Sequence, residues 1–295
     1  MQAGQRRHIE AMAGQPLARA DFLPGGSTGE TWLLTFADGA RLVAKTGGAG
    51  ASLAVEGWML RWLAARSALP VPEVISAAPD LLLLQYIPPQ GELSAAAEAD
   101  AADHLAALHA LTAPRFGLER DTVIGPLPQP CPWTADWCTF LRDRRLMFMG
   151  RLALEAGHLP VPVMARLEHF CRRLDSWIPR HPPVSLIHGD VWQGNLLCGD
   201  GRIAAFIDPA LYYADAEIEL AYILLFRTFG ETFFARYRER RPLDAEFFTL
   251  RSRIYQLYPL LVHACLYGGD YAGQVDAILR HFTARKALLR GPAAG

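Results

Sequence analysis

The sequence predicts an α+β protein of two lobes, in which an antiparallel β-sheet with one helix precedes a mainly helical lobe with one β-hairpin. Three observations predict this arrangement. β-Favouring segments separated by turn residues fill the first part of the chain, the stretch Pro-Pro-Gln-Gly at 88–91 breaks that pattern, and apolar residues beyond it recur at helical spacing. We therefore expect lobes of residues 1–87 and 88–295.

Strands and one helix are expected in the first lobe. Asp38–Gly39 is a turn signal between two β-favouring segments and predicts a hairpin. Ser52 can cap a helix, because apolar residues follow it at helical spacing, and Leu69–Pro72 cannot continue that helix. The segment 81–84 is apolar throughout, which is typical of a strand buried on both faces. The strands expected in this lobe are 31–36, 40–45, 74–75 and 81–84.

Helices dominate the expected second lobe. They are interrupted between Val184 and Asp208, where Gly199–Gly201 is expected to turn one short strand back into another as a hairpin. A sheet lobe, a short hinge and a helical lobe with an inserted hairpin form a bilobal, protein-kinase-like fold. The helices expected are about 94–111, 137–154 and 163–177, with more between 217 and 289.

Charge and cysteine content exclude several classes of protein. The formal net charge is −1, so no cationic field favours nucleic acid or an anionic membrane surface. The five cysteines have neither C-x-x-C nor zinc-type spacing, which indicates reduced thiols. The sequence has no apolar signal segment and no apolar run long enough to cross a bilayer. We therefore expect a soluble cytoplasmic protein with no nucleic-acid partner and no membrane partner.

The segment His188–Asn195, followed after the predicted hairpin by Asp208, carries the most specific chemical signal. Phosphoryl transfer to a hydroxyl needs a carboxylate that orients and deprotonates the acceptor, and oxygen ligands that hold Mg²⁺ on the phosphates. Asp190 is the expected catalytic base and a contact to the acceptor substrate. Asn195, five residues later, and Asp208 are the expected magnesium ligands, because Mg²⁺ prefers such oxygen atoms.

Each of these residues also has an ordinary structural interpretation. Asp190 can cap a turn, Asn195 can occupy a left-handed position, and Asp208 can simply end a strand. The H-x-D-x-x-x-x-N spacing together with an aspartate after a hairpin favours the catalytic interpretation. His188 is expected to support the loop by hydrogen bonds rather than to carry a proton.

The first lobe is expected to hold the phosphates of ATP. Gly26, Ser27 and Thr28 precede the predicted hairpin, where small residues and free N–H groups can approach phosphate oxygens, although such a run is equally an ordinary loop. Lys45 ends the second strand and can reach the α- and β-phosphates, and Glu56 on the next helix can pair with it. A surface lysine and a helix-face glutamate are the alternative.

Adenine is expected where the chain passes from one lobe to the other. The apolar strand at 81–84 offers a surface for the base, and backbone groups near Gln85, Tyr86 and Ile87 can bond to it. The sequence contains neither a G-x-x-x-x-G-K-[ST] phosphate loop nor a G-x-G-x-x-G dinucleotide motif. P-loop and Rossmann nucleotide folds are therefore excluded.

Four stretches resemble the fructosamine kinase family, which is also called the ketosamine-3-kinase family and belongs to the superfamily of the aminoglycoside phosphotransferases. The loop with Trp192 is similar to that family's catalytic loop, and the resemblance covers nearly the whole chain. The stretches are His188–Asn195, Ile207–Tyr213, Phe116–Leu146 and Tyr255–Tyr271. Cys131–Pro132, Ala216 and Val262 depart from the residues common in the family.

The resemblance implies ATP and Mg²⁺ as cofactors and phosphorylation of a sugar hydroxyl of a ketosamine, the product of a sugar and an amine, which can lead to deglycation. The implied partner is a small-molecule ketosamine or glycated amine. Carried onto this chain, Asp190 is the base, Asn195 and Asp208 bind magnesium, and Lys45 and Glu56 form the phosphate clamp.

Two aromatic residues are candidates for contacting the sugar, because pyranose C–H faces stack on rings. We name Trp192 and Trp137, for which core packing is the alternative. Three related acceptors remain open, namely those of aminoglycoside, choline and homoserine kinases. A nucleotide-binding pseudokinase that serves as a scaffold is the alternative outside catalysis, although no residue that catalysis needs is missing.

Overall fold

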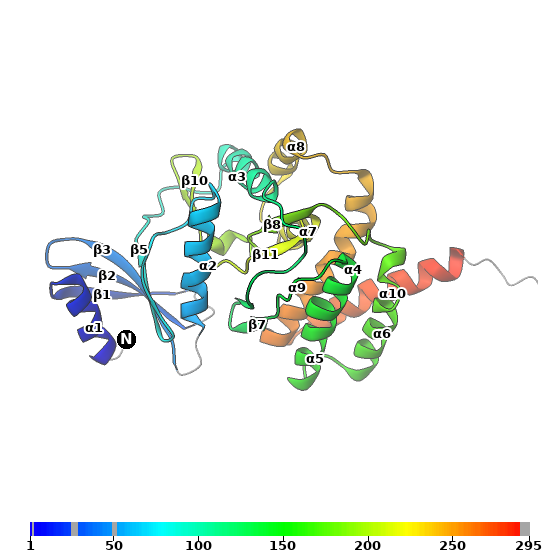
Figure 1. Ribbon diagram of the computed structural model, residues 1–295, viewed down its shortest axis with the longest axis horizontal. Helices are drawn as coiled ribbons and strands as arrows, with labels where there is room; N and C mark the ends of the chain where they lie inside the picture. The colour runs from blue at the N-terminus through cyan, green and yellow to red at the C-terminus, as the bar shows by residue number, and fades with distance from the viewer. Residues whose placement is uncertain (2, 25–28, 49–51, 290–295) are drawn as a thin grey trace, which may run out of the picture.

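The computed structural model describes residues 1, 3–24, 29–48 and 52–289, with side chains to residue 284. The chain forms two lobes side by side (Figure 1). The N-terminal lobe holds the antiparallel sheet, and the larger C-terminal lobe is mainly helical with three two-stranded sheets among the described residues. The fold class expected from the sequence is confirmed.

The N-terminal sheet has five antiparallel strands in the order β1-β2-β3-β5-β4. The predicted turn at Asp38–Gly39 joins β2 to β3. The helix predicted after Ser52 is present as α2 (Leu53–Arg66). The strands are β1 (Leu17–Leu23), β2 (Glu30–Phe36), β3 (Arg41–Thr46), β4 (Val74–Ala78) and β5 (Leu81–Gln85).

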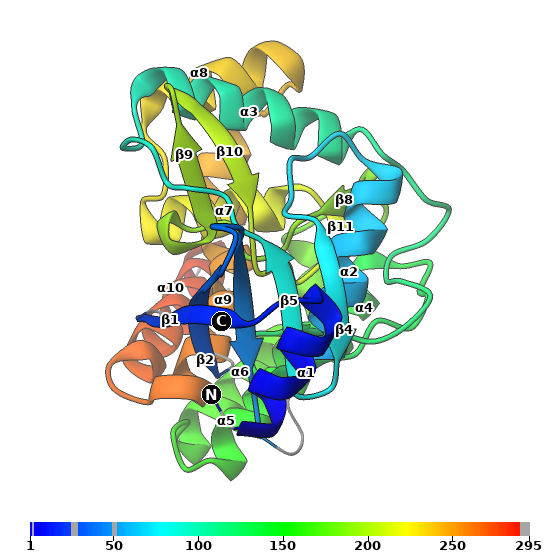
Figure 2. The ribbon, with the colours of Figure 1, turned by 90° about the vertical axis from the view of Figure 1, so that its left-hand side faces the viewer.

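Strand β5 is buried on both faces, as its uninterrupted apolar sequence predicted. Leu81 and Leu83 pack into the cluster that contains Ile9 of helix α1 (Ala3–Ala13). Leu82 and Leu84 point to the opposite face and pack with Leu53 and Leu60 of α2. Figure 2 shows α1 in front of the sheet and α2 behind it.

The prediction of a single helix in the N-terminal lobe was wrong, because α1 and the edge strand β1 precede the predicted hairpin. Helix α1 buries only Gln5 and Ile9, so a single apolar side chain marks its buried face. Strand β1 lies at the edge of the sheet, and its exposed positions include one charged residue, Arg19.

The C-terminal lobe follows the predicted order of helices and hairpin. The predicted turn at Gly199–Gly201 joins β9 to β10, with Gly199 opposite Arg202. The longer helices are α3 (Ala95–His109), α5 (Met147–Glu155), α6 (Val161–Cys171), α7 (Glu217–Phe226), α8 (Glu231–Arg240), α9 (Ser252–Tyr267) and α10 (Tyr271–Leu289). The short elements are α4 (Trp137–Phe140), β6 (Thr122–Ile124), β7 (Leu127–Gln129), β8 (Val184–Ile187), β9 (Leu196–Gly199), β10 (Arg202–Phe206) and β11 (Tyr212–Asp215).

Helix α2 is packed against both lobes. Met59, Trp62 and Leu63 belong to the hydrophobic core of the C-terminal lobe, although α2 belongs to the other lobe by sequence. The Trp62 indole donates a hydrogen bond to Glu119 at 3.0 Å, and its ring packs edge-on against Tyr213. These contacts fix α2, and hence Glu56 in its first turn, relative to the C-terminal lobe.

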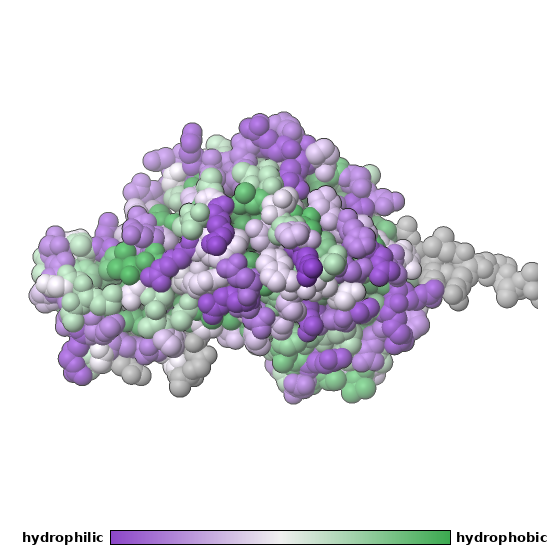
Figure 3. Space-filling view, viewed as in Figure 1, coloured by the Kyte–Doolittle hydropathy of each residue, from purple (hydrophilic) through white to green (hydrophobic). Residues whose placement is uncertain are grey.

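The surface in Figure 3 carries hydrophilic residues over both lobes. Within the described parts of the chain, no helix is long and apolar enough to cross a membrane.

Candidate active site

Lys45 lies between the two lobes, with a carboxylate from each. It sits near the end of β3, opposite Thr31 of β2 and Leu82 of β5. Its Nζ donates to Glu56 Oε1 at 2.8 Å and also forms an ion pair with Asp208, which follows β10. The Lys45 and Glu56 side chains are only 8% and 7% exposed, so the pair is a buried one and not the surface pair considered as an alternative.

Burial and charge oppose each other in this cluster. Burial lowers the pKa of Lys45, but the charges of Asp208 and Glu56 more than offset it, so the pKa is raised and the ammonium form persists. Burial raises the pKa of Glu56, and Lys45 opposes that rise. The result is a fixed positive charge at the mouth between the lobes, where phosphate groups need one.

Asp190 is held by two hydrogen bonds, one on each carboxylate oxygen. Asn195 donates from Nδ2 to Oδ2 at 2.8 Å, and Tyr222 of α7 donates from its hydroxyl to Oδ1 at 2.5 Å. Asn195 Nδ2 also donates to the Asp190 carbonyl at 2.9 Å. Because the side-chain amide nitrogen of Asn195 is occupied in this way, the side-chain oxygen Oδ1 is the atom left to face a cation.

The backbone around Asp190 ties the catalytic loop to the segment after the hairpin. The backbone N–H of Ala210 donates to the backbone carbonyl of His188 at 2.8 Å. The backbone N–H of Ile207 donates to the backbone carbonyl of Asn195 at 3.0 Å. Gly189 has a φ of +89°, and a Cβ there would lie 2.2 Å from the Ala210 carbonyl oxygen, so only glycine fits. These contacts bring Asp208 to the same site as Asp190 and Asn195.

Burial raises the pKa of Asp190 to about 7, although the hydrogen bond from Tyr222 lowers it. Asp208 raises it further and Asn195 lowers it. A carboxylate with a pKa near the working pH is well suited to accept a proton from a hydroxyl.

A chain of buried side chains supports this loop, and sequence reasoning missed it. Glu219 of α7 accepts hydrogen bonds from the backbone N–H groups of Gly189 at 2.5 Å and His188 at 3.4 Å. Its other partner is His109 at 2.8 Å, which in turn contacts the Tyr237 hydroxyl at 2.7 Å. The one available signal was a glutamate inside the very apolar helix 217–226.

His188 supports the loop, as expected. Its Nδ1 accepts a hydrogen bond from the Asp190 backbone N–H at 3.3 Å. The ring is completely buried, and burial lowers its pKa, so the neutral form is favoured.

A cavity of about 230 Å³ lies between the lobes beside Lys45 and Asp208. Its walls are almost entirely apolar, and it opens at the passage from one lobe to the other. Gln85, Tyr86 and Ile87, the residues predicted to meet adenine, all line it. The remaining lining residues come from the sheet, the loops beside it and the catalytic hairpin: Leu23, Thr31, Leu33, Val43, Pro72, Leu84, Pro89, Leu197 and Ile207.

The other predicted contacts have different outcomes. Gly26, Ser27 and Thr28 lie outside the described residues. Trp192 is 41% exposed beside the catalytic loop, and its ring covers Gly194 so closely that a Cβ there would lie 2.2 Å from it. Trp137 is completely buried, packs on Phe140 and donates to the Tyr255 hydroxyl at 3.1 Å. The prediction that Trp137 contacts the sugar was therefore wrong, because its ring has no free surface.

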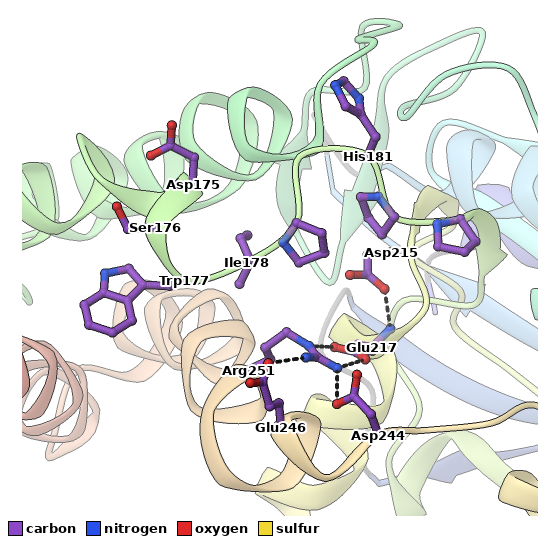
Figure 4. Close-up of a pocket in the computed structure, with 13 residues that line it drawn as sticks. Asp175, Ser176, Trp177, Ile178, His181, Asp215, Glu217, Asp244, Glu246 and Arg251 are labelled. Atoms are coloured by element: carbon purple, nitrogen blue, oxygen red, sulfur yellow. Dashed lines mark hydrogen bonds and ion pairs between the residues drawn. The ribbon is translucent and has the colours of Figure 1, made fainter.

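A second cavity, of about 640 Å³, lies in the C-terminal lobe and contains none of the predicted catalytic residues (Figure 4). Arg251 pairs there with Glu217 at 2.6 Å and Asp244 at 2.8 Å. Asp215 accepts hydrogen bonds from the Tyr255 hydroxyl at 2.5 Å and the Glu217 backbone N–H at 3.1 Å. These pairs join the start of α7 to the start of α9, which is a structural role.

A buried lysine–glutamate pair, a loop with aspartate and asparagine five residues apart, and a further aspartate after a hairpin are the working parts of a phosphotransferase of the protein-kinase-like fold. Residues 1–285 match the family model described as fructosamine kinase. The chain belongs to the fructosamine kinase family, and it is therefore a phosphotransferase that acts on a hydroxyl group.

Individual relatives agree with this assignment. The chain is 33% identical over 262 residues to "Probable ketoamine kinase YniA" of Escherichia coli K12, covering 84% of this chain and 87% of that protein. It is 36% identical over 203 residues to a protein of Enterococcus faecium that is also named as a ketoamine kinase, covering 68% of this chain and 71% of that protein.

Solved structures show the same fold. A Thermobifida fusca protein assigned as a fructosamine-3-kinase has a TM-score of 0.82 and 27% identity, covering 95% of this chain and 98% of that one. The aminoglycoside phosphotransferase APH(4)-Ia, in a complex with ADP and hygromycin B, has a TM-score of 0.66 and 19% identity. That match covers 93% of this chain and 97% of the other.

Proposed function

We propose that this protein uses ATP and Mg²⁺ to phosphorylate a sugar hydroxyl of a ketosamine, with residues 1–87 holding the nucleotide and residues 88–295 the acceptor. The arrangement around Asp190 carries the proposal. Its carboxylate is fixed by Asn195 and Tyr222, has a pKa near 7, and belongs to the same site as the Lys45–Asp208 pair.

Each residue has a distinct part in the proposed reaction. Asp190 orients the acceptor hydroxyl and takes its proton as the oxygen attacks the γ-phosphorus, while the bond from that phosphorus to the β–γ bridging oxygen breaks and ADP leaves. Lys45, held by Glu56, binds the α- and β-phosphates. The base of the nucleotide occupies the apolar cavity beside Gln85, Tyr86 and Ile87.

The residues present fit a magnesium ion. Asn195 offers its side-chain oxygen Oδ1, and Asp208 offers a carboxylate. Mg²⁺ typically takes one or two such protein ligands together with phosphate oxygens and waters. When bound, the ion neutralises charge on the transferred phosphoryl group. Among the described residues, no group of three or more histidine, cysteine, aspartate or glutamate side chains could hold a metal ion.

The acceptor class follows from the relatives. Two of them are named as ketoamine kinases and one solved structure is assigned as a fructosamine-3-kinase, so we propose the 3-hydroxyl of a fructosamine as the reacting group. Trp192 is exposed and lies two residues after Asp190, and it is the residue proposed to stack on the sugar. We further propose that the reaction serves deglycation in the cytoplasm, where ATP is available.

The test is a comparison of acceptors with the purified protein. ATP consumption with magnesium is measured in the presence of a fructosyl amino acid, choline, homoserine or an aminoglycoside. Selective turnover of the fructosyl amino acid supports the proposal. Turnover of another acceptor would retain the catalytic residues but replace the substrate, and tight ATP binding without any turnover would favour a scaffold protein instead.

A further inference from the structure

The two oxygen atoms of the Asp190 carboxylate have different surroundings. Oδ2 accepts from Asn195, which is on the side proposed to face magnesium. Oδ1 accepts only from the Tyr222 hydroxyl among the described residues. Because a carboxylate oxygen has two acceptor sites, Oδ1 keeps one site free, and this is where an acceptor hydroxyl can bind.

The Tyr222 hydroxyl is fixed beside that free site. Tyr222 is only 6% exposed, its ring packs against Phe226 one turn later in α7 at a centroid distance of 4.7 Å, and its proton points to Asp190. A phenol oxygen that donates its proton can still accept a hydrogen bond. No described residue donates a hydrogen bond to it, so its acceptor position is unused within the described part of the chain.

We infer that the Tyr222 hydroxyl binds the acceptor directly, by accepting a hydrogen bond from a second hydroxyl on a carbon next to the reacting one. The inference rests on the proposed function, since it assigns a specificity residue to that site. The Tyr222 hydroxyl oxygen and a reacting hydroxyl oxygen, when both are hydrogen-bonded to Asp190 Oδ1, lie roughly 4.7 Å apart at ordinary hydrogen-bond geometry. Hydroxyls on adjacent carbons of a sugar are about one hydrogen-bond length apart, so the second hydroxyl can bridge from the reacting one to Tyr222.

This contact selects a chemical class of acceptor. A ketosamine that reacts at its 3-hydroxyl carries oxygen on both neighbouring carbons, the anomeric hydroxyl at C2 and the hydroxyl at C4. Choline and homoserine each have one hydroxyl and none on the adjacent carbon. A site with a buried phenol acceptor beside the base therefore favours a polyhydroxylated acceptor over these two, because an acceptor without the second hydroxyl leaves the phenol oxygen unsatisfied.

The test compares kcat/KM for a fructosyl amino acid with kcat/KM for its 4-deoxy, 2-deoxy and 5-deoxy analogues. With the wild-type protein, kcat/KM for the 4-deoxy or the 2-deoxy analogue should be about tenfold lower than for the 5-deoxy analogue, which keeps the pyranose ring and lacks a hydroxyl that is not adjacent to C3. Tyr222→Phe should lower kcat/KM for every acceptor, because Asp190 loses one orienting bond, and should reduce this discrimination to about twofold or less.

Tyr255→Phe is the matched control. Its hydroxyl also donates to a buried aspartate at 2.5 Å, but that aspartate is Asp215, outside the catalytic site. This variant should keep the wild-type discrimination between analogues. Circular dichroism of each variant confirms that it is folded before kinetics are compared.

Three outcomes overturn the inference. The first is a wild-type protein that phosphorylates the fructosyl amino acid but does not distinguish the 4-deoxy and 2-deoxy analogues from the 5-deoxy one, a result that needs no variant. The second is a Tyr222→Phe variant that discriminates between the analogues as strongly as the wild type. The third is faster turnover of all acceptors by that variant, which would mean that the Tyr222 hydroxyl obstructs the acceptor site. If the wild-type protein does not phosphorylate the fructosyl amino acid, the proposed function itself has failed.

Discussion

Lys45 of strand β3 and Asp208 of the C-terminal lobe form an ion pair that joins the two lobes. Both side chains line the apolar cavity between the lobes, and Glu56 binds the same ammonium group from behind. In the proposed reaction Lys45 binds the phosphates and Asp208 binds magnesium. The pair therefore marks the place where the triphosphate is expected.

Replacing Lys45 by alanine should affect both binding and stability. ATP affinity should fall at least about tenfold and kcat/KM more steeply, because the phosphates lose their fixed positive charge. The loss also leaves Glu56 buried without its partner, so the free energy of unfolding should fall by about 3 kcal/mol. Isothermal titration with ATP and urea unfolding measure the two effects. Unchanged ATP affinity would contradict the assignment of Lys45.

Asp208→Asn tests the proposed magnesium ligand with little strain, because Asp208 has a φ of +56° and asparagine tolerates that conformation well. The variant should need at least about tenfold more magnesium for half-maximal rate, since a neutral amide replaces an anionic ligand. Rates are measured over a magnesium titration at fixed ATP. A magnesium dependence equal to that of the wild type would remove Asp208 from the metal site.

Asp215 should make the stability of the protein depend on pH. Burial raises its pKa to about 7, well above the usual value for an aspartate of about 4. Between these values the folded chain binds more protons at this site than the unfolded chain, so its contribution to the free energy of unfolding falls as the pH rises. Asp215→Asn lacks this effect.

The Asp215→Asn variant should therefore become more stable relative to wild type between pH 5 and pH 7.5. Urea unfolding of both proteins at the two pH values gives the difference directly. A difference that stays constant with pH would show that Asp215 titrates normally. A side-by-side comparison is needed because other groups also titrate in this range.

The sequence predicted the parts of the fold whose cause is local. The apolar run Leu81–Leu84 is buried on both faces because it lies between α1 and α2, and the turn at Asp38–Gly39 joins two adjacent strands. Helix α1 was missed because it buries only Gln5 and Ile9, so only one apolar side chain of this polar segment belongs to the core.

In the site, too, features set by local sequence were predicted and features set by contacts between distant segments were missed. Asp190 and Asn195 were predicted to act together from their spacing of five residues, and the structure shows a hydrogen bond between them. Glu219 and Tyr222 were missed because α7 meets that loop only through packing of distant segments, and nothing in a helical sequence shows which face will do so. Trp137 was misplaced because an aromatic side chain suits a core as well as a sugar site.

Asp190 is the proposed base of an ATP-dependent ketosamine kinase. The most direct measurement is transfer of labelled γ-phosphate from ATP to a fructosyl amino acid by wild-type protein and by Asp190→Ala, with ATP affinity measured in parallel. We expect a sugar phosphate with the wild type, a rate at least about 100-fold lower in the variant, and similar ATP affinity in both. Comparable rates in the two proteins would contradict this proposal.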